Sequence, residues 1–372
     1  MSELPGFSFL EDELDRLRRE GLFRQIRQTQ GLIDFSSNDY LGLAREIPHG
    51  DSFQAGSGAS RLISGNYPLI EQAEEELATF YNTEAALLFV SGYQANIGLF
   101  QALAGRNDTL IFDELCHASI RDGIRLSHAK AVSFRHNNMD DLRLKLKSAQ
   151  GNTFIITEGL FSMDGDKAYL DSIAGICRES GAFLILDEAH SAGITGTDGS
   201  GLAVMHQLAD ICMAKIIGLG KAHGCQGGAV LGSHQLKQLL INKHRGFIFS
   251  TGMSPILAGA ILNSVVKLRD SSVQRAQLNR NISYYNQKIS ALSGARATGN
   301  QGPVQAVFTP GNELTISISE SIRNQGVNVG GVRYPTVPKG TERIRIILHS
   351  FNTQHEIDLL INVLNENLHA KK

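Results

Sequence analysis

Short apolar runs alternate with glycine turns and amphipathic segments through the middle of the chain. Between Asn82 and Gly232, seven runs rich in Val, Ile, Leu and Phe follow one another: AALLFVSG, DTLIFDE, AVSFRHN, NTFIITEG, AFLILDEAH, CMAKIIGLGK and GGAVLGS. Most lack polar alternation, which is typical of strands buried on both faces. The helical periods between them, such as QANIGLFQALAG and LDSIAGICRESG, are long enough to make crossovers. The pattern predicts an α/β domain with a mainly parallel seven-stranded sheet covered by helices.

The pattern changes after about Arg269. A long polar helix, SSVQRAQLNRNISYYNQKISAL, is followed by short alternating strands around VQAVFTP, VNVGGVRYP and ERIRIIL. Helices are expected near NELTISISESIRNQG and TQHEIDLLINVLNENL, so this part is predicted to be a smaller α+β domain. We therefore expect an N-terminal arm over residues 1–45, a large domain over 46–270 and a small C-terminal domain over 271–372.

Charge and composition argue mainly against certain classes of protein. Lys and Arg total 35 against 37 Asp and Glu, and the net charge of -2 offers no basic field for nucleic acid or an anionic membrane. The amino terminus lacks the leader and apolar core of a signal peptide, and no apolar run is long enough for a membrane span. The four cysteines form no C-x-x-C pair, so a soluble protein of a reducing cytoplasm is expected.

Polar residues at the ends of the predicted strands are the candidates for chemistry, because ligands of open α/β sheets gather there. Asp187 ends the run AFLILDEAH, with His190 three residues later. A buried carboxylate needs a cationic partner, and an ordinary salt bridge or a helix cap is the alternative. Lys221 ends the run CMAKIIGLGK, where desolvation can make its amine a nucleophile toward a carbonyl. A solvated lysine at a turn is the alternative here.

Three further strand ends carry suggestive residues. Ser91-Gly92-Tyr93 leaves the run AALLFV and opens a helix whose free N–H groups suit a phosphate, although a simple left-handed turn is as consistent. His117 follows DTLIFDE, and Glu158 and Ser162 follow NTFIIT. A fixed carboxylate, a nucleophilic lysine, a phosphate-binding turn and a flat imidazole together match the needs of pyridoxal 5'-phosphate (PLP). The lysine would form the Schiff base, and the carboxylate would keep the pyridine nitrogen protonated.

Other motifs give weaker hypotheses. The DEAH segment at residues 187–190 resembles a Walker-B signature, so an NTP-driven or NTP-binding protein is the hypothesis from another class. However, GLGKA lacks the upstream glycine and the following Ser or Thr of a phosphate-binding P-loop. GSGASR lacks the third glycine of a dinucleotide fingerprint, no G-x-S-x-G elbow occurs, and the histidines show no metal-ligand spacing.

An ordered series of motifs resembles the α-oxoamine synthases, a family of fold-type I PLP-dependent transferases, over nearly the whole chain. The matching segments are FSSNDYLGL (35–43), GSGASRLISGN (56–66), LLFVSGYQAN (87–96), HASIRDGIRLSHAK (117–130), TEGLFSMDGD (157–166), LDEAHSAGITGTDGSG (186–201), GLGKAHG (218–224), FSTGMSP (249–255) and RYPTVPKGTERIRI (333–346).

The resemblance implies a role for each residue that would act on the cofactor ring. Lys221 would form the Schiff base, and Asp187 would pair with the pyridine nitrogen. His117 would stack on the ring. His190 would hydrogen-bond the phenolic oxygen, with Ser162 nearby.

The resemblance also implies how the phosphate is held. The backbone at Gly92 and Tyr93 would bind it, and Ser250 or Thr251 would reach it from the neighbouring subunit of a homodimer. Glu158 is counted with the cofactor-binding residues.

Substrate contacts are implied in the same way. Arg345 would clamp the carboxylate of the amino acid, a task that suits a bidentate guanidinium. Asn38 and Arg24 would contact the acyl substrate, and Ser60 would leave room for the methyl group of alanine. The C-terminal half most resembles members that condense L-alanine with a pimeloyl thioester in biotin synthesis. The carrier would be coenzyme A or an acyl carrier protein. Serine palmitoyltransferase and 2-amino-3-ketobutyrate CoA ligase are the alternatives.

The sequence departs from the family pattern at several positions. Gly218 stands where the family usually has a Thr or Ser hydroxyl for the phosphate. Ile70 and Asn352 replace frequent histidines, and the segment Ala44 to Ala55 is shorter than usual. We therefore expect one cofactor contact to be missing or replaced by backbone.

Overall fold

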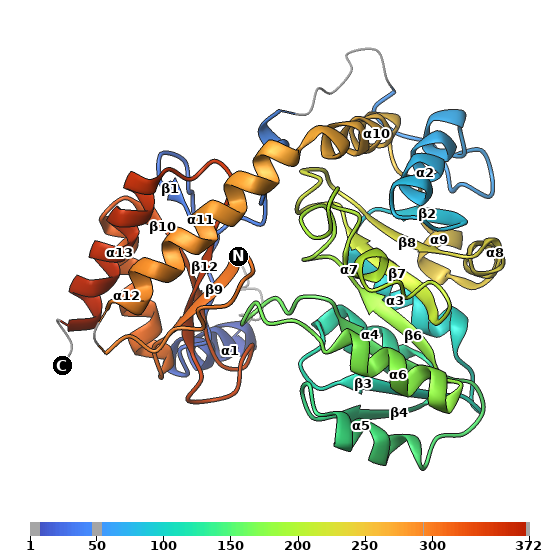
Figure 1. Cartoon of the computed structure of the whole chain (residues 1–372), viewed down its shortest axis with the longest axis horizontal. Coiled ribbons are helices and arrows are strands. Elements are labelled where there is room, and N and C mark those ends of the chain that lie inside the picture. The colour runs from blue at the N-terminus through green and yellow to red at the C-terminus, as the bar shows by residue number, and fades with distance from the viewer. Residues whose placement is uncertain (1–7, 47–53, 293, 370–372) are drawn as a thin grey trace, which may run out of the picture.

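The computed structural model describes residues 8–46, 54–292 and 294–369. In these ranges no helix is both long enough and apolar enough to span a membrane. The described elements form two groups joined by helices α10 (Pro255–Asp270) and α11 (Ser272–Ser290), as Figure 1 shows.

The larger group is built around a seven-stranded sheet. Its strands are β2 (Ala85–Phe89), β3 (Thr109–Asp113), β4 (Lys130–Phe134), β5 (Thr153–Glu158), β6 (Phe183–Asp187), β7 (Cys212–Gly218) and β8 (Gly228–Gly232). The strand order is β2-β8-β7-β6-β5-β3-β4, and β8 alone runs antiparallel to its neighbours. Each of the seven predicted runs forms one strand, so the expected α/β fold is confirmed.

Helices cover both faces of this sheet. They are α2 (Pro68–Phe80), α3 (Gly92–Leu103), α4 (Ala118–Leu126), α5 (Met139–Leu146), α6 (Leu170–Ser180), α7 (Leu202–Met205), α8 (His234–Lys243) and α9 (Arg245–Ile248). Successive residues of one strand enter different cores: Ile156 of β5 packs with α3 and α4, whereas Ile155 packs with α5 and α6. Two buried faces explain why most of the strand sequences are apolar, while β4, at the edge of the sheet, is largely exposed.

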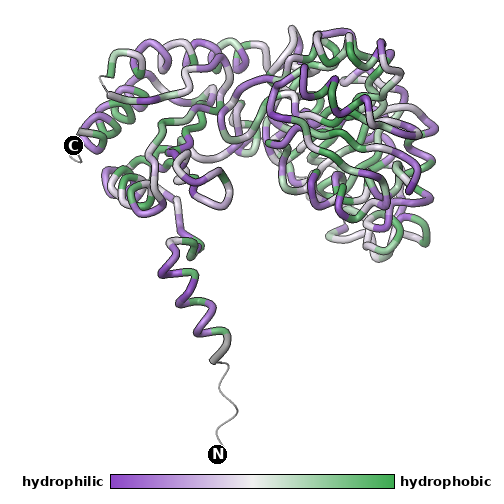
Figure 2. Tube along the Cα trace, turned by 90° about the horizontal axis from the view of Figure 1, so that it is seen from below, coloured by the Kyte–Doolittle hydropathy of each residue, from purple (hydrophilic) through white to green (hydrophobic). Residues whose placement is uncertain are grey.

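The smaller group contains a three-stranded antiparallel sheet of order β11-β12-β9. Its elements are β9 (Val304–Phe308), β10 (Val327–Asn328), β11 (Gly330–Val332), β12 (Arg343–Ile347), α12 (Asn312–Asn324) and α13 (Gln354–His369). From the N-terminal segment, β1 (Ile33–Asp34) pairs in parallel with β10. Helix α1 (Ser8–Arg19) projects away from the rest of the described chain (Figure 2). The domain boundaries after residues 45 and 270 stay predictions.

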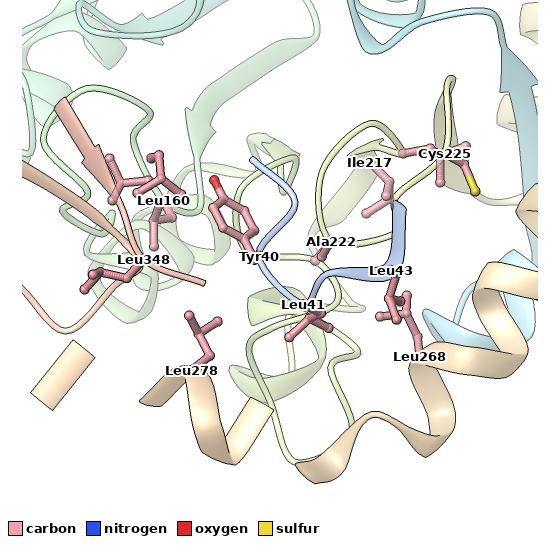
Figure 3. Close-up of a cluster of buried hydrophobic side chains, with 14 of the residues drawn as sticks. Tyr40, Leu41, Leu43, Leu160, Ile217, Ala222, Cys225, Leu268, Leu278 and Leu348 are labelled. Atoms are coloured by element: carbon pink, nitrogen blue, oxygen red, sulfur yellow. The ribbon is translucent and has the colours of Figure 1, made fainter. Parts of the chain in front are cut away.

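A buried apolar cluster joins the two groups next to the candidate site. Tyr40, Leu41 and Leu43 come from the N-terminal segment, the last from the short 3-10 helix Leu43–Arg45, and all three are almost fully buried. Figure 3 shows Tyr40 between Leu348, which follows β12, and Ala222, which follows Lys221, while Leu43 lies beyond Ala222, next to Leu268 of α10. This packing fixes the N-terminal segment, including Asn38, against the carboxyl ends of the large sheet.

Candidate active site

A cavity of about 350 Å³ opens where the strands of the large sheet end. The register of the parallel strands places Glu158 of β5 beside Asp187 of β6, and the same edge carries the loop with Lys221. The sequence-predicted residues that line this cavity are Asn38, Gly92, Tyr93, His117, Glu158, Asp187, His190 and Lys221. Residues from six separate segments of the chain therefore meet at one place.

Asp187 is a buried carboxylate, 5% exposed, that accepts two hydrogen bonds. Asn96 Nδ2 donates to Oδ2 at 2.9 Å, and the backbone N–H of Ala189 donates to Oδ1 at 2.9 Å. Among the described residues, no cationic side chain forms a salt bridge with it, although the Lys221 amine lies near enough to interact with its charge. The carboxylate thus keeps free acceptor capacity for a cation that enters the cavity.

Lys221 is the amine of the site. Loss of water around the side chain lowers its pKa to about 8, although the nearby carboxylates of Asp187 and Glu158 act in the opposite direction. Within the described part of the chain, its ammonium forms neither a hydrogen bond nor a salt bridge. The amine is therefore available, and near neutral pH a useful fraction of it is unprotonated and nucleophilic.

Glu158 supports the loop that carries His117. Its side chain is 3% exposed, and its Oε1 accepts the backbone N–H of His117 at 2.5 Å. Burial and the negative charge of Asp187 raise the pKa of Glu158 to about 8. Glu158 therefore orients the start of α4, where the imidazole of His117 is attached.

The imidazole of His117 is held by two residues that the sequence reasoning did not select, Ser119 and Asn96. Ser119 Oγ lies 2.8 Å from His117 Nδ1, and Asn96 Nδ2 donates to Ser119 Oγ at 3.0 Å. Exclusion of water lowers the pKa of His117, which favours a neutral ring. Asn96 also bonds Asp187 and so links the carboxylate to the imidazole. Its position four residues after Gly92 on α3 was the available signal, since i and i+4 share a helix face.

His190 is paired with another residue missing from the sequence-based candidates, Tyr40. The Tyr40 hydroxyl lies 2.5 Å from His190 Nδ1, and both side chains are buried. Burial lowers the pKa of His190 well below its ordinary value and raises that of Tyr40. A phenol that donates to Nδ1 leaves the proton of the neutral imidazole on Nε2, which makes this nitrogen a donor.

The first turn of α3 provides a place for an anion. Ser91 caps the helix by accepting the N–H of Gln94 at 3.1 Å, and the N–H groups of Gly92 and Tyr93 have no intrahelical partner. Strand β8 lies against this turn so closely that a Cβ on Gly228 would fall 2.4 Å from the Gly92 nitrogen. Gly218 also lines the cavity, so in this chain no hydroxyl extends from that position.

Arg345 of β12 comes from the smaller group; it is not among the residues that line the Lys221 cavity, but it contacts Asn38, which does line it. Its Nε donates to the carbonyl of Ser162 at 2.7 Å, and its Nη2 donates to Asn38 Oδ1 at 3.0 Å. Burial lowers the pKa of Arg345, but no carboxylate of the described chain pairs with it. Ser162 therefore contributes its backbone carbonyl to Arg345, and its side chain is not among the cavity-lining groups.

Four predicted residues lie elsewhere in this chain. Ser250 and Thr251 line a separate small cavity near Gln94, and Ser250 Oγ donates to the Gly246 carbonyl at 2.6 Å. Arg24 lines a cavity of about 620 Å³ and donates to Thr336 Oγ1 at 3.2 Å. Ser60 lies in a turn that does not line the cavity of Lys221.

Ile70 and Asn352, two other positions where the sequence departs from the family pattern, belong to the packing of the fold. Ile70 is fully buried in the apolar core, and Asn352 accepts the backbone N–H of His349 at 2.9 Å. Most of the short segment after Ala44, residues 47–53, lies outside the described residues.

Comparison with known proteins shows to which family the chain is similar. The family model of aminotransferase class I and II matches residues 30–364. The chain is 36% identical over 375 residues to 8-amino-7-oxononanoate synthase of Lysinibacillus sphaericus (95% of this chain, 96% of the relative). It is 37% identical over 377 residues to the enzyme of the same name from Geotalea daltonii (95% and 96%).

Solved structures resemble the chain along its whole length. Serine palmitoyltransferase of Sphingomonas wittichii superposes with a TM-score of 0.88 at 25% identity (100% of this chain, 99% of the other). A structure described as SPT with PLP gives a TM-score of 0.89 at 26% identity (98% of each). 8-Amino-7-oxononanoate synthase from Francisella tularensis gives 0.79 at 29% identity (91% and 98%). The resemblance to α-oxoamine synthases is thus confirmed, and the chain belongs to the aminotransferase class I and II family.

Proposed function

We propose that this enzyme uses PLP to condense L-alanine with a pimeloyl thioester, giving 8-amino-7-oxononanoate, CO2 and the free carrier, a step of biotin synthesis. The observation that carries the proposal is the pairing, in one cavity, of an unpartnered Lys221 amine with the buried Asp187 carboxylate. The relatives of this name, identical at about one position in three over nearly the whole chain, supply the substrate class.

The residues of the cavity fit PLP. The cofactor carries an aldehyde, a ring nitrogen and a phosphate. Lys221 offers an amine for the aldehyde, and Asp187 offers an acceptor for the protonated ring nitrogen. The first turn of α3 offers free N–H groups for the phosphate. His117 offers a flat ring at the same cavity, and His190 Nε2 offers a hydrogen-bond donor. When bound, PLP withdraws electrons from the α-carbon of an amino acid joined to it, so that C–H and C–C bonds there can break.

The chain's own groups would perform the remaining tasks. Lys221 Nζ would take the α-proton of alanine and later return a proton, because a pKa of about 8 allows both directions near neutral pH. Arg345 would bind the carboxylate of alanine through the guanidinium N–H groups that Ser162 and Asn38 leave free. Burial of the site excludes water, which strengthens these electrostatic contacts.

The acyl donor would be recognised partly by charge. The cavity of about 620 Å³ around Arg24 is also lined by Arg18, Arg27, Arg323 and Arg333, while Glu320 is its one acidic residue. Glu320 forms a salt bridge with Arg27 at 2.6 Å, so the other arginines have no acidic partner among the residues that line this cavity. An anionic group suits such a cavity. We propose that Arg24 contacts the acyl substrate, whose pimeloyl chain ends in a carboxylate.

The chain is further proposed to work as a cytoplasmic homodimer. Ser250 and Thr251 lie outside the Lys221 cavity of their own chain, as expected if they serve the phosphate site of a partner subunit.

The test combines amino acids with acyl donors. The purified enzyme with PLP is incubated with L-alanine, glycine or L-serine and with pimeloyl-CoA, pimeloyl acyl carrier protein, palmitoyl-CoA or acetyl-CoA. Mass spectrometry should detect 8-amino-7-oxononanoate from L-alanine and a pimeloyl donor. The better of the two pimeloyl donors identifies the carrier. Product from L-serine and palmitoyl-CoA alone would replace the proposal by serine palmitoyltransferase activity, and product from glycine and acetyl-CoA alone would favour 2-amino-3-ketobutyrate CoA ligase.

A further inference from the structure

One loop connects the large sheet to Arg345. The loop spans residues 159–168 between β5 and α6, and it reaches the smaller group at its tip. There the Ser162 carbonyl accepts Arg345 Nε at 2.7 Å, and Asp164 forms a salt bridge with Arg343 of β12. Gly165, with φ 72°, packs so tightly that an added Cβ would lie 2.0 Å from a carbonyl oxygen of β9. Gly165 therefore has no room to move closer to β9. The position of the loop determines where the Ser162 carbonyl lies, and this carbonyl in turn orients the guanidinium of Arg345.

The base of the loop is held by His136, which follows β4. His136 Nδ1 lies 2.9 Å from Asp113 Oδ1, and Nε2 lies 2.7 Å from Asp166 Oδ2 in the loop. The ring also packs edge-on against Phe161, with centroids 4.5 Å apart. An ionised carboxylate only accepts hydrogen bonds, so both ring nitrogens must carry a proton and the side chain is an imidazolium. Burial lowers the pKa of His136, but the hydrogen bonds with Asp113 and Asp166 outweigh this and raise it to about 10.

Asn137 strengthens the same junction. Its backbone N–H donates to Asp113 Oδ2 at 3.1 Å, and its Nδ2 donates to Asp166 Oδ2 at 3.1 Å and to the Lys167 carbonyl at 3.0 Å. Asn137 adopts a left-handed conformation, with φ 52°, to make these contacts. The carboxylate of Asp113 is fully buried, so loss of the imidazolium would leave it facing Asp166 with only neutral donors between them.

We propose that His136, as an imidazolium, is a positioning residue: it fixes the loop 159–168 and, through the Ser162 carbonyl, orients Arg345 toward the carboxylate of the amino acid. The inference rests on the proposed role of Arg345. His136 is not a catalytic residue, because it does not line the Lys221 cavity. Its loss therefore acts on recognition of the carboxylate and leaves the chemistry at Lys221 in place.

The experiment compares two ligands of the PLP-loaded enzyme. L-Alanine carries the carboxylate that Arg345 would bind, and ethylamine is the same amine without it. H136Q should raise the KM and the spectrally determined Kd for L-alanine about tenfold, as expected when a contact of about 1.4 kcal/mol is lost. It should leave kcat and the Kd for ethylamine within about twofold. D166N, which keeps the ring and the Asp113 pair, should weaken L-alanine binding in the same direction by a smaller factor.

A matched control is available in another histidine–aspartate pair. His206 Nδ1 lies 2.7 Å from Asp171 Oδ1, and neither residue belongs to the loop 159–168 or lines the Lys221 cavity. H206Q should change neither ligand's affinity. Thermal unfolding checks that each variant is folded, and D166N decides the question should H136Q not fold.

Three results would overturn the inference. They are unchanged L-alanine binding in the folded variants, equal weakening of both ligands, or a similar effect of H206Q. R345A separates this inference from the proposed function. If R345A leaves L-alanine binding unchanged, the assigned role of Arg345 itself is wrong. If R345A weakens it strongly while H136Q and D166N do not, only the positioning role of His136 is wrong.

Discussion

Replacing Asn96 by alanine should damage the site without touching any group that would react. Asn96 is 2% exposed, and its Nδ2 donates to Asp187 at 2.9 Å and to Ser119 at 3.0 Å. A hydrogen bond to a charged group contributes about 1.5–3 kcal/mol, and one between neutral groups contributes about 1 kcal/mol. The free energy of unfolding of the apoprotein should therefore fall by about 3 kcal/mol in N96A.

The same substitution should weaken cofactor binding. Asp187 would keep only the N–H of Ala189 as a donor, and the Ser119 hydroxyl that orients His117 would lose its own donor. A less fixed carboxylate and imidazole should raise the Kd for PLP about tenfold, equivalent to about 1.4 kcal/mol. The expected pattern is thus a combined loss of stability and of cofactor affinity.

Asn281 of α11 provides the matched control. It is 1% exposed, and its Nδ2 donates to the carbonyls of His349 at 2.8 Å and Asn352 at 2.7 Å, away from the Lys221 cavity. N281A also loses the hydrogen bond that Asn281 Oδ1 accepts from Gln277 Nε2 at 2.9 Å. With three hydrogen bonds to neutral groups lost, it should cost about 3 kcal/mol of stability, with PLP affinity unchanged.

The assay pairs urea denaturation of the two apoproteins with absorbance titration by PLP. If N96A cost less than about 1 kcal/mol, the energetic argument would be refuted. If both variants lost PLP affinity equally, the link between Asn96 and the cofactor would be refuted instead.

Two further predictions concern the phosphate site and the amine. G228A should push the first turn of α3 away, because the new Cβ would lie 2.4 Å from the Gly92 nitrogen, and PLP affinity should fall about tenfold or more. The control G175A, in helix α6 where a Cβ meets nothing within 4 Å, should stabilise the protein by about 0.5–1 kcal/mol; equal effects on PLP would contradict the assignment. Because the pKa of Lys221 is lowered to about 8, the reactive amine forms as pH rises through 8. The rate at which apoprotein combines with PLP should increase with pH and level off above about pH 9, whereas a rate still rising at pH 10 would show an unperturbed lysine.

Much of the fold could be predicted because buried strands have apolar sequences. The runs that form β3, β5 and β6 are apolar along most of their length because each of these strands is covered on both faces, whereas the edge strand β4 is largely exposed. Asp187 and Lys221 could be found because polar residues end such runs. The order of the strands in the sheet has no comparable signal in the sequence. Nothing in the sequence GGAVLGS shows that β8 lies between β2 and β7 or that it runs antiparallel to both.

The partners of the site residues could not be predicted for a related reason. Tyr40 meets His190 across 150 positions of sequence, and Arg345 meets Ser162 across 183. Such pairs depend on how the smaller group and the N-terminal segment pack against the large sheet. A local pattern does not contain that information. Sequence reasoning therefore identified the groups at the strand ends and missed those that hold them in place.

The central claim is that the Lys221 amine forms the bond to the PLP aldehyde beside Asp187. The most direct measurement is borohydride reduction of the protein incubated with PLP, followed by proteolysis and mass spectrometry of every lysine-containing peptide. The account predicts one phosphopyridoxyl group per chain on Lys221, and its loss in K221A. A label on another lysine, or an equal label in K221A, would contradict it.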